Sequence, residues 1–149
     1  MAKVPETIFL GLICLLLSSC SLLRPGGLSA PSAVQSEYFT TDMAGFKVNR
    51  DDLSRLVFRY FIDLTINKPV PKSALLELSF ENPQDKTRPL GMTKILSGDE
   101  KTLSFRSEPV SGLRAYQGYA IDIFLYENST KANLLGKHRQ VVQSIVNQR

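Results

Sequence analysis

The chain has 149 residues, a net charge of +4, two cysteines, one histidine and no tryptophan. This length is typical of a single domain, and the mild basic charge fits a solvated surface. One histidine and so few cysteines cannot provide the usual ligands of a zinc site, which argues against a zinc-dependent function.

An apolar run, Ile8–Leu17, follows a short N-terminal segment that carries Lys3. Its length of about ten residues is too short for a helix that crosses the hydrocarbon core of a bilayer, which is about 30 Å thick. The run is therefore interpreted as the core of a signal peptide. It leads into Leu17-Ser18-Ser19-Cys20, an order that resembles the lipobox of bacterial lipoproteins.

This resemblance implies that the Cys20 thiol carries diacylglycerol, that the chain is cleaved before Cys20, and that the new amino group is acylated. Ser21, where an aspartate would retain the protein in the inner membrane, implies an outer-membrane lipoprotein that faces the periplasm. Two or three acyl chains together hold a protein on a bilayer. An ordinary secretory peptide with an incidental Cys20 is the alternative. Because Cys14 lies in the cleaved segment, the mature chain would have no disulfide.

The composition divides the chain into three parts. Residues 1–19 are the predicted signal peptide, and residues 20–37 are the lipidated cysteine and a flexible tether rich in Ser, Leu, Pro, Gly and Ala. Residues 38–149 are the predicted domain. Without a disulfide this domain must depend on an apolar core, and its size is sufficient for one.

The domain has the alternation of β-strands and almost no helical periodicity. In Val57–Ile66 the even positions are all apolar and the odd positions include Arg59 and Asp63, which predicts a strand with one buried face. Asn67–Pro71 ends this strand, because proline cannot donate to a ladder. The other predicted strands are Tyr38–Val48, Ala74–Phe80, Met92–Leu96, Thr102–Arg106, Tyr119–Tyr126 and Leu134–Val142, with turns at 49–52, 82–85, 97–100 and 127–133 and a strand end or helical turn at 141–146.

The segment Ser111–Tyr126 resembles the corner and following strand of fibronectin type III and related immunoglobulin-like modules. The resemblance implies that Leu113 closes the bottom of the core. It also implies that the Tyr119 hydroxyl bonds to the backbone of the corner. The predicted fold is all-β: a single antiparallel, immunoglobulin-like β-sandwich of about seven strands behind a signal peptide and a tether.

The sequence does not indicate catalytic chemistry. His138 has no cysteine partner and no local nucleophile, so it is interpreted as an ordinary strand or hairpin position. The carboxylates are scattered over turns and strand exteriors, and no phosphate loop, nucleophile elbow or calcium loop is present. We therefore expect a protein that is not an enzyme, with no cofactor and no metal. The expected localisation excludes nucleic acid as a partner.

A partner interface is predicted on one face of the sandwich. If the strands that begin at Ala74, Tyr119 and Leu134 share a sheet, its outward side chains form an apolar patch with a polar rim. The alternative is that this face is covered by the segment around Tyr38 and Phe39 or by Ile145 and Val146. The predicted interface residues are Leu75, Phe124, Tyr126 and Arg139.

These observations together predict a lipid-anchored, periplasm-facing binding or assembly module of the bacterial envelope. An accessory or pilotin-like role with an envelope protein partner fits this description. Two alternatives remain: a passive structural lipoprotein, or a carrier of a lipid, lipopolysaccharide or sugar ligand. The carrier would hold its ligand at an edge of the sandwich or in an interior pocket lined by Phe58, Tyr60, Phe80, Phe105 and Ile123.

Overall fold

The structure is a computed structural model, and it describes residues 32–148. The predicted signal peptide, Cys20 and most of the predicted tether lie outside these residues. Within residues 32–148, no helix has the length and hydropathy needed to cross a membrane.

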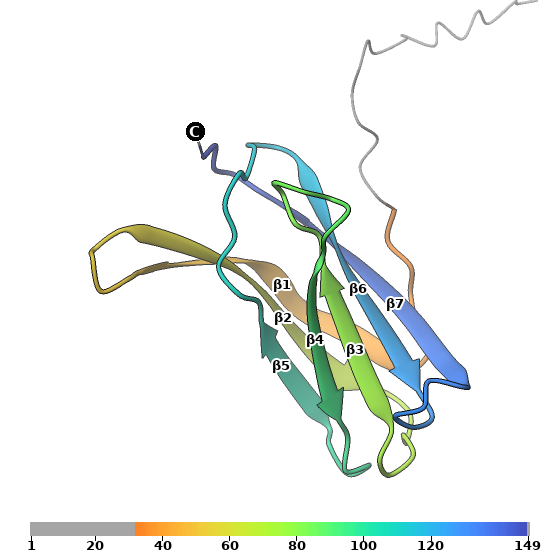
Figure 1. Ribbon diagram of the computed structural model, residues 1–149. Coiled ribbons are helices and arrows are strands. Elements are labelled where there is room, and N and C mark those ends of the chain that lie inside the picture. Colours follow the sequence, from red (N-terminus) through yellow and green to blue (C-terminus); the bar gives the residue numbers. More distant parts are fainter. Residues whose placement is uncertain (1–31, 149) are drawn as a thin grey trace, which may run out of the picture.

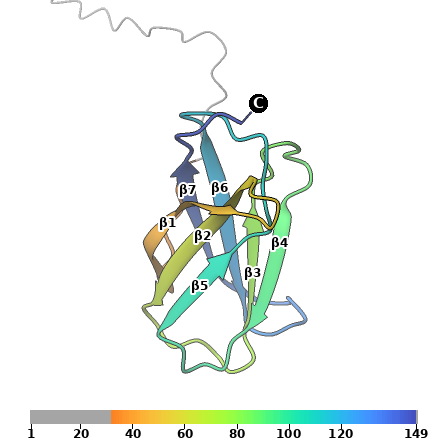
Figure 2. The ribbon, with the colours of Figure 1, turned by 90° about the vertical axis from the view of Figure 1, so that its left-hand side faces the viewer.

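Seven antiparallel strands form two sheets that pack face to face (Figures 1 and 2). The order in the three-stranded sheet is β1-β2-β5, and in the four-stranded sheet it is β4-β3-β6-β7. This arrangement confirms the predicted all-β, immunoglobulin-like sandwich. The strands are β1 (Phe39–Arg50), β2 (Leu56–Ile66), β3 (Leu75–Phe80), β4 (Leu90–Ile95), β5 (Thr102–Arg106), β6 (Gly118–Tyr126) and β7 (Leu134–Gln143).

The core lies between the sheets and follows from the alternation in the sequence. In β2 the even positions from Phe58 to Leu64 are buried, whereas the odd positions between them are partly exposed. Strand β6 has the same pattern, with Ile121, Ile123 and Leu125 fully buried. Burying one large apolar side chain contributes about 1.5–3 kcal/mol, so these two central strands supply much of the stability.

Two tyrosine hydroxyl groups connect the core to the loops at one end of the sandwich. The backbone N–H of Arg114 donates to the Tyr119 hydroxyl over 2.8 Å, and Leu113 is fully buried. Both features were predicted from the resemblance and are confirmed. The Tyr60 hydroxyl donates to the carbonyl of Glu81 over 2.7 Å, a contact that the sequence did not reveal.

The first two strands are longer than predicted. The register continues through Val48↔Phe58 to Arg50↔Leu56, so the predicted turn at 49–52 begins two residues too early. No proline or glycine interrupts the ladder here, and the pairing extends past the edge of the core. We call residues 47–59 the β1–β2 arm; it projects sideways from the sandwich (Figures 1 and 2).

Both described ends of the chain lie at the same end of the sandwich (Figures 1 and 2). Val34 belongs to the predicted tether by composition, but it exchanges two backbone hydrogen bonds with Arg139 of β7, at 3.0 and 2.7 Å. The Tyr38 ring lies close to the backbone of residue 136, which is a glycine. A Cβ at this position would be 2.9 Å from Tyr38 Cδ2. After Gln143 the chain is irregular, without the helical turn considered above.

Candidate functional site

The outer face of the four-stranded sheet carries a row of apolar side chains across all four strands. The register aligns Ile95 of β4 with Leu75 of β3, Leu75 with Tyr126 of β6, and Tyr126 with Leu134 of β7. Phe124 lies on the same face, two residues before Tyr126. We call the surface formed by these five residues the apolar face.

The residues of this face differ in accessibility. Leu75 is only 7% exposed because Ile95 and Tyr126 flank it on both sides, so the expectation that Leu75 is an accessible contact is wrong. Ile95 and Leu134, at the two ends of the row, are 59% and 52% exposed. The sequence reasoning missed both residues, although each follows from strand alternation once the register is known.

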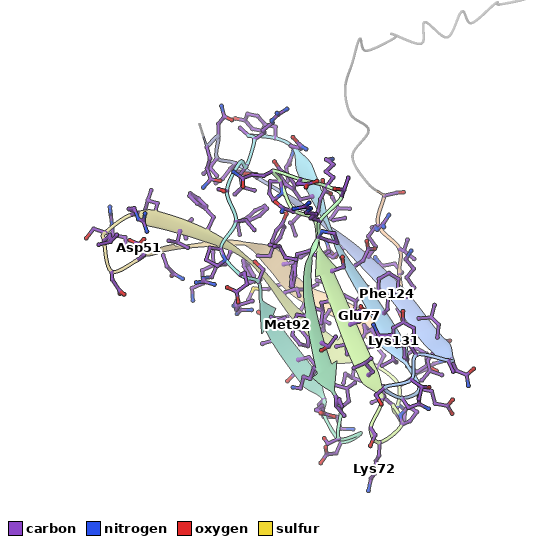
Figure 3. All side chains as sticks on the ribbon, viewed as in Figure 1. Asp51, Lys72, Glu77, Met92, Phe124 and Lys131 are labelled. Carbon is purple, nitrogen blue, oxygen red and sulfur yellow. The ribbon has the colours of Figure 1, made fainter. Side chains whose placement is uncertain are left out.

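Two lysines cover the aromatic rings. The Lys137 ammonium lies 5.3 Å from the centre of the Phe124 ring, and the Lys131 ammonium lies 5.7 Å from the centre of the Tyr126 ring. Lys131 also forms an ion pair with Glu77 over 2.9 Å, and Figure 3 shows these two side chains near Phe124 on the same side of the sheet. Both lysines are exposed, so a partner can displace them from the rings.

The residues that the sequence suggested as a cover for the apolar face lie elsewhere. Phe39 is 1% exposed and belongs to the core, and Ile145 is 84% exposed near the opposite end of β7. Tyr38 packs against the core and lies close to Gly136. None of the three is seen to cover the apolar face.

Next to the apolar face, the same sheet is polar. Arg139 forms a two-pronged ion pair with Asp122, at 2.6 and 2.8 Å, and this carboxylate raises the pKa of Arg139. A second pair joins Lys86 to Glu81 over 2.8 Å. These four residues line a surface pocket of about 370 Å³. The charges that line this pocket are therefore balanced within the protein. Arg139 lies beside the apolar face with its charge already paired.

His138 occupies a strand position, as predicted, but its ring is fully buried. Its Nε2 lies 2.7 Å from Oγ1 of Thr41, and burial lowers its pKa. Among residues 32–148, no group of three His, Cys, Asp or Glu side chains is placed to hold a metal ion. Cys20, the predicted lipidation residue, lies outside the described part of the chain.

The five residues considered for an interior ligand pocket are packed against one another. Tyr60 and Ile123 are fully buried, and the Tyr60 and Phe80 rings lie 5.5 Å apart, a normal packing distance for aromatic pairs. Phe58 and Phe105 are 6% and 4% exposed and belong to the same core cluster. These side chains therefore fill the interior.

Comparisons with known proteins add little to this description. No family model matches the chain, and no curated protein matches it. One similar solved structure is the crystal structure of Bacteroides uniformis β-glucuronidase, at 13% sequence identity and a TM-score of 0.42. The match covers 71% of this chain but 12% of that enzyme, and at this similarity it supports no functional inference.

Proposed function

We propose that this protein is a lipid-anchored, periplasm-facing binding or assembly module of the bacterial cell envelope, without catalytic activity. It binds an envelope protein through the apolar face, as an accessory or pilotin-like component. The anchor is Cys20 and the expected membrane is the outer membrane. The observation that carries the proposal is the apolar row from Ile95 to Leu134, which crosses all four strands.

The composition of the face supports protein binding. Aromatic side chains lie at its centre, the exposed aliphatic residues Ile95 and Leu134 lie at its two ends, and charged residues border it; these are Glu77, Lys131 and Lys137. Protein interfaces commonly have such an apolar centre and polar rim. Anchoring the domain to a membrane raises its local concentration near an envelope partner, so a modest contact area is sufficient.

The packed core does not favour a carrier with an interior ligand site, because the side chains proposed to line that site contact each other. A passive structural lipoprotein would need only its anchor and would not require the apolar row. The experiment below distinguishes this role from partner binding.

The test uses the full-length protein in its native membranes. A photo-crosslinking residue at Leu134 or Ile95 is compared with one at Leu53, which is 72% exposed on the β1–β2 arm. We expect a discrete crosslinked protein from the first two positions and none from Leu53. Adding Phe124→Asp should abolish the product while leaving the thermal unfolding of the protein within a few degrees of wild type.

A parallel Cys20→Ser chain tests the anchor. It should leave the membrane fraction or remain there as the uncleaved precursor, and it should lose the crosslink. Equal crosslinking from all three positions, or an unchanged product with Phe124→Asp, would contradict the interface. A Cys20→Ser chain that is processed and retained like the wild type would contradict the lipid anchor.

A further inference from the structure

The β1–β2 arm has a fixed tip. Oδ1 of Asp51 accepts hydrogen bonds from the backbone N–H groups of Leu53 and Arg55, at 3.0 and 2.8 Å. The Asp51 carboxylate also pairs with the Arg55 guanidinium over 2.7 Å. Ser54 has a φ of 59°, which closes the loop. This network holds the loop in one conformation with Leu53 facing outward.

The arm exposes apolar side chains that do not pack on the sandwich. Val48 is 46% exposed, Leu53 is 72% exposed and Leu56 is 56% exposed. A folded domain normally buries such side chains, and a cluster of them at the end of a projecting hairpin indicates a contact surface. The arm has four basic residues and two acidic ones, so its net charge is positive; the basic residues are Lys47, Arg50, Arg55 and Arg59, and the acidic residues are Asp51 and Asp52.

The apolar surface continues from the arm onto the end of the sandwich. A groove of about 220 Å³ lies between Val48 and Phe58 on the arm side and Ile145 and Val146 on the other. Ile145 is 84% exposed. Tyr116, which is 80% exposed, lies beside this segment, because its N–H donates to the carbonyl of Ser144 over 2.7 Å.

The position of the N-terminus favours a membrane as the occupant of this surface. The described chain begins at Ser32, at the same end of the sandwich as the C-terminal segment with Ile145 (Figures 1 and 2). Ser32 follows the predicted lipidated Cys20 by twelve positions, a span of about 40 Å at most when fully extended. A lipid anchor at Cys20 therefore keeps this end of the domain within reach of the bilayer surface.

We propose that the β1–β2 arm, with Ile145 and Tyr116 beside it, docks on an anionic lipid surface. This inference rests on the lipid anchor of the proposed function. Leu53 and Tyr116 enter the interfacial region, where apolar and aromatic side chains are favoured, and the arm cations lie among the lipid phosphates. Because the arm belongs to the three-stranded sheet and projects away from the four-stranded sheet (Figure 1), such docking leaves the outer face of the four-stranded sheet free for a protein partner.

The absence of tryptophan from the chain allows a clean test. Leu53→Trp places a single tip reporter on the arm, and Lys72→Trp places a matched far reporter at the other end of the molecule; Asp51, next to the tip, and Lys72 are labelled in Figure 3. The full-length lipidated protein is reconstituted into phosphatidylcholine vesicles with and without phosphatidylglycerol. Quenching of the indole fluorescence by brominated lipid then reports contact with the bilayer.

We expect brominated lipid to quench the tip reporter at least threefold more strongly than the far reporter when phosphatidylglycerol is present. The difference should shrink in phosphatidylcholine alone, in high salt, and when Lys47→Glu and Arg50→Glu are added to Leu53→Trp. Each variant must keep the wild-type circular dichroism spectrum and melting temperature. The charge-reversed pair therefore separates loss of docking from loss of folding.

Equal quenching of the two reporters on vesicles that hold the protein would overturn the proposal while leaving the anchor intact. Protection of the tip reporter only after an envelope extract is added would also overturn it, because the arm would then contact a protein. Failure of the lipidated chain to associate with vesicles at all would overturn both this proposal and the anchor.

Discussion

Nε2 of His138 lies 2.7 Å from Oγ1 of Thr41, and this contact connects β7 of one sheet to β1 of the other. Both residues lie on edge strands, and the contact occurs where the pairing of β1 with β2 shifts register between Thr41 and Met43. The imidazole is fully buried, and within residues 32–148 its Nδ1 has no hydrogen-bond partner and no carboxylate pairs with it. Burial without a paired carboxylate therefore favours the neutral ring, and it lowers the pKa of His138.

This geometry predicts lower stability at mildly acidic pH. Burial lowers the pKa of His138 in the folded protein, whereas in the unfolded chain it titrates near 6.5. Below about pH 6.5 the unfolded state thus binds more protons than the folded state. The free energy of unfolding should therefore decrease as the pH is lowered, by at most about 1.4 kcal/mol per pH unit. Urea unfolding at pH 7.5, 6.5 and 5.5 measures this slope.

His138→Gln is the control for that slope, since the chain has no other histidine. It should be less stable than wild type at pH 7.5 and should show almost no change in stability between pH 7.5 and 5.5. A wild-type free energy of unfolding that is constant over this range would contradict a buried, neutral His138.

Tyr119→Phe should reduce the free energy of unfolding by about 1–2 kcal/mol. The substitution keeps the buried ring but leaves the Arg114 N–H without the acceptor that it has at 2.8 Å. Chemical denaturation at pH 7.5 measures the loss. Tyr126→Phe is a matched control, because the Tyr126 ring lies on the half-exposed outer face, and it should change the stability by less than about 0.5 kcal/mol. Equal effects of the two substitutions would argue against the corner bond.

Gly136→Ala should loosen the N-terminal segment without unfolding the sandwich. The new Cβ would lie 2.9 Å from Tyr38 Cδ2 and 3.2 Å from Ser36 Oγ, so the segment must move away from β7. Hydrogen exchange should then become faster at the amides of Val34 and Arg139, which bond each other's carbonyls in the wild type. Gly91→Ala is a suitable control, because a Cβ there meets no atom within 4 Å. Unchanged exchange at Val34 would contradict the predicted displacement.

Glu100 should stabilise the β4–β5 turn only when it is ionised. Its carboxylate accepts the backbone N–H groups of Ser97 and Gly98 at 2.8 and 2.9 Å, and these bonds lower its pKa to about 2. Because the unfolded pKa is higher, the stabilisation is complete above about pH 5 and is lost as the pH falls toward 2. Glu100→Gln should therefore be less stable than wild type at pH 7, and the two proteins should converge at low pH. A gap in stability that is independent of pH would contradict this assignment.

Strand alternation was sufficient to predict most of the fold. In β2, β3 and β6 every second residue is a large apolar side chain, so their inward faces were predictable before the register was known. The arm was less predictable, because the residues at 47–50 and 55–57 do not alternate regularly in polarity and have no core to bury them. Only the observed pairing from Lys47↔Arg59 to Arg50↔Leu56 shows that both strands continue there.

The candidate site was predicted in part. Phe124, Tyr126 and Arg139 lie on one outer face, as expected from the shared sheet, because every second residue of a strand points to the same side. The neighbours of each residue depend on register. The register places the buried Leu75 between Ile95 and Tyr126. The same register places Arg139 opposite Asp122.

The sequence by itself determined the all-β class, the position of the core strands and the tyrosine corner, because each depends on local periodicity or on a short motif; the lipid anchor at Cys20 stays a prediction from such a motif. Only the tertiary structure decided which side chains are covered. Lys131 reaches back from its loop to Tyr126, Val34 binds the edge of β7, and His138 bonds Thr41 across the two sheets. These contacts join residues that are distant along the chain, and they are fixed by strand register and by the packing of one sheet on the other.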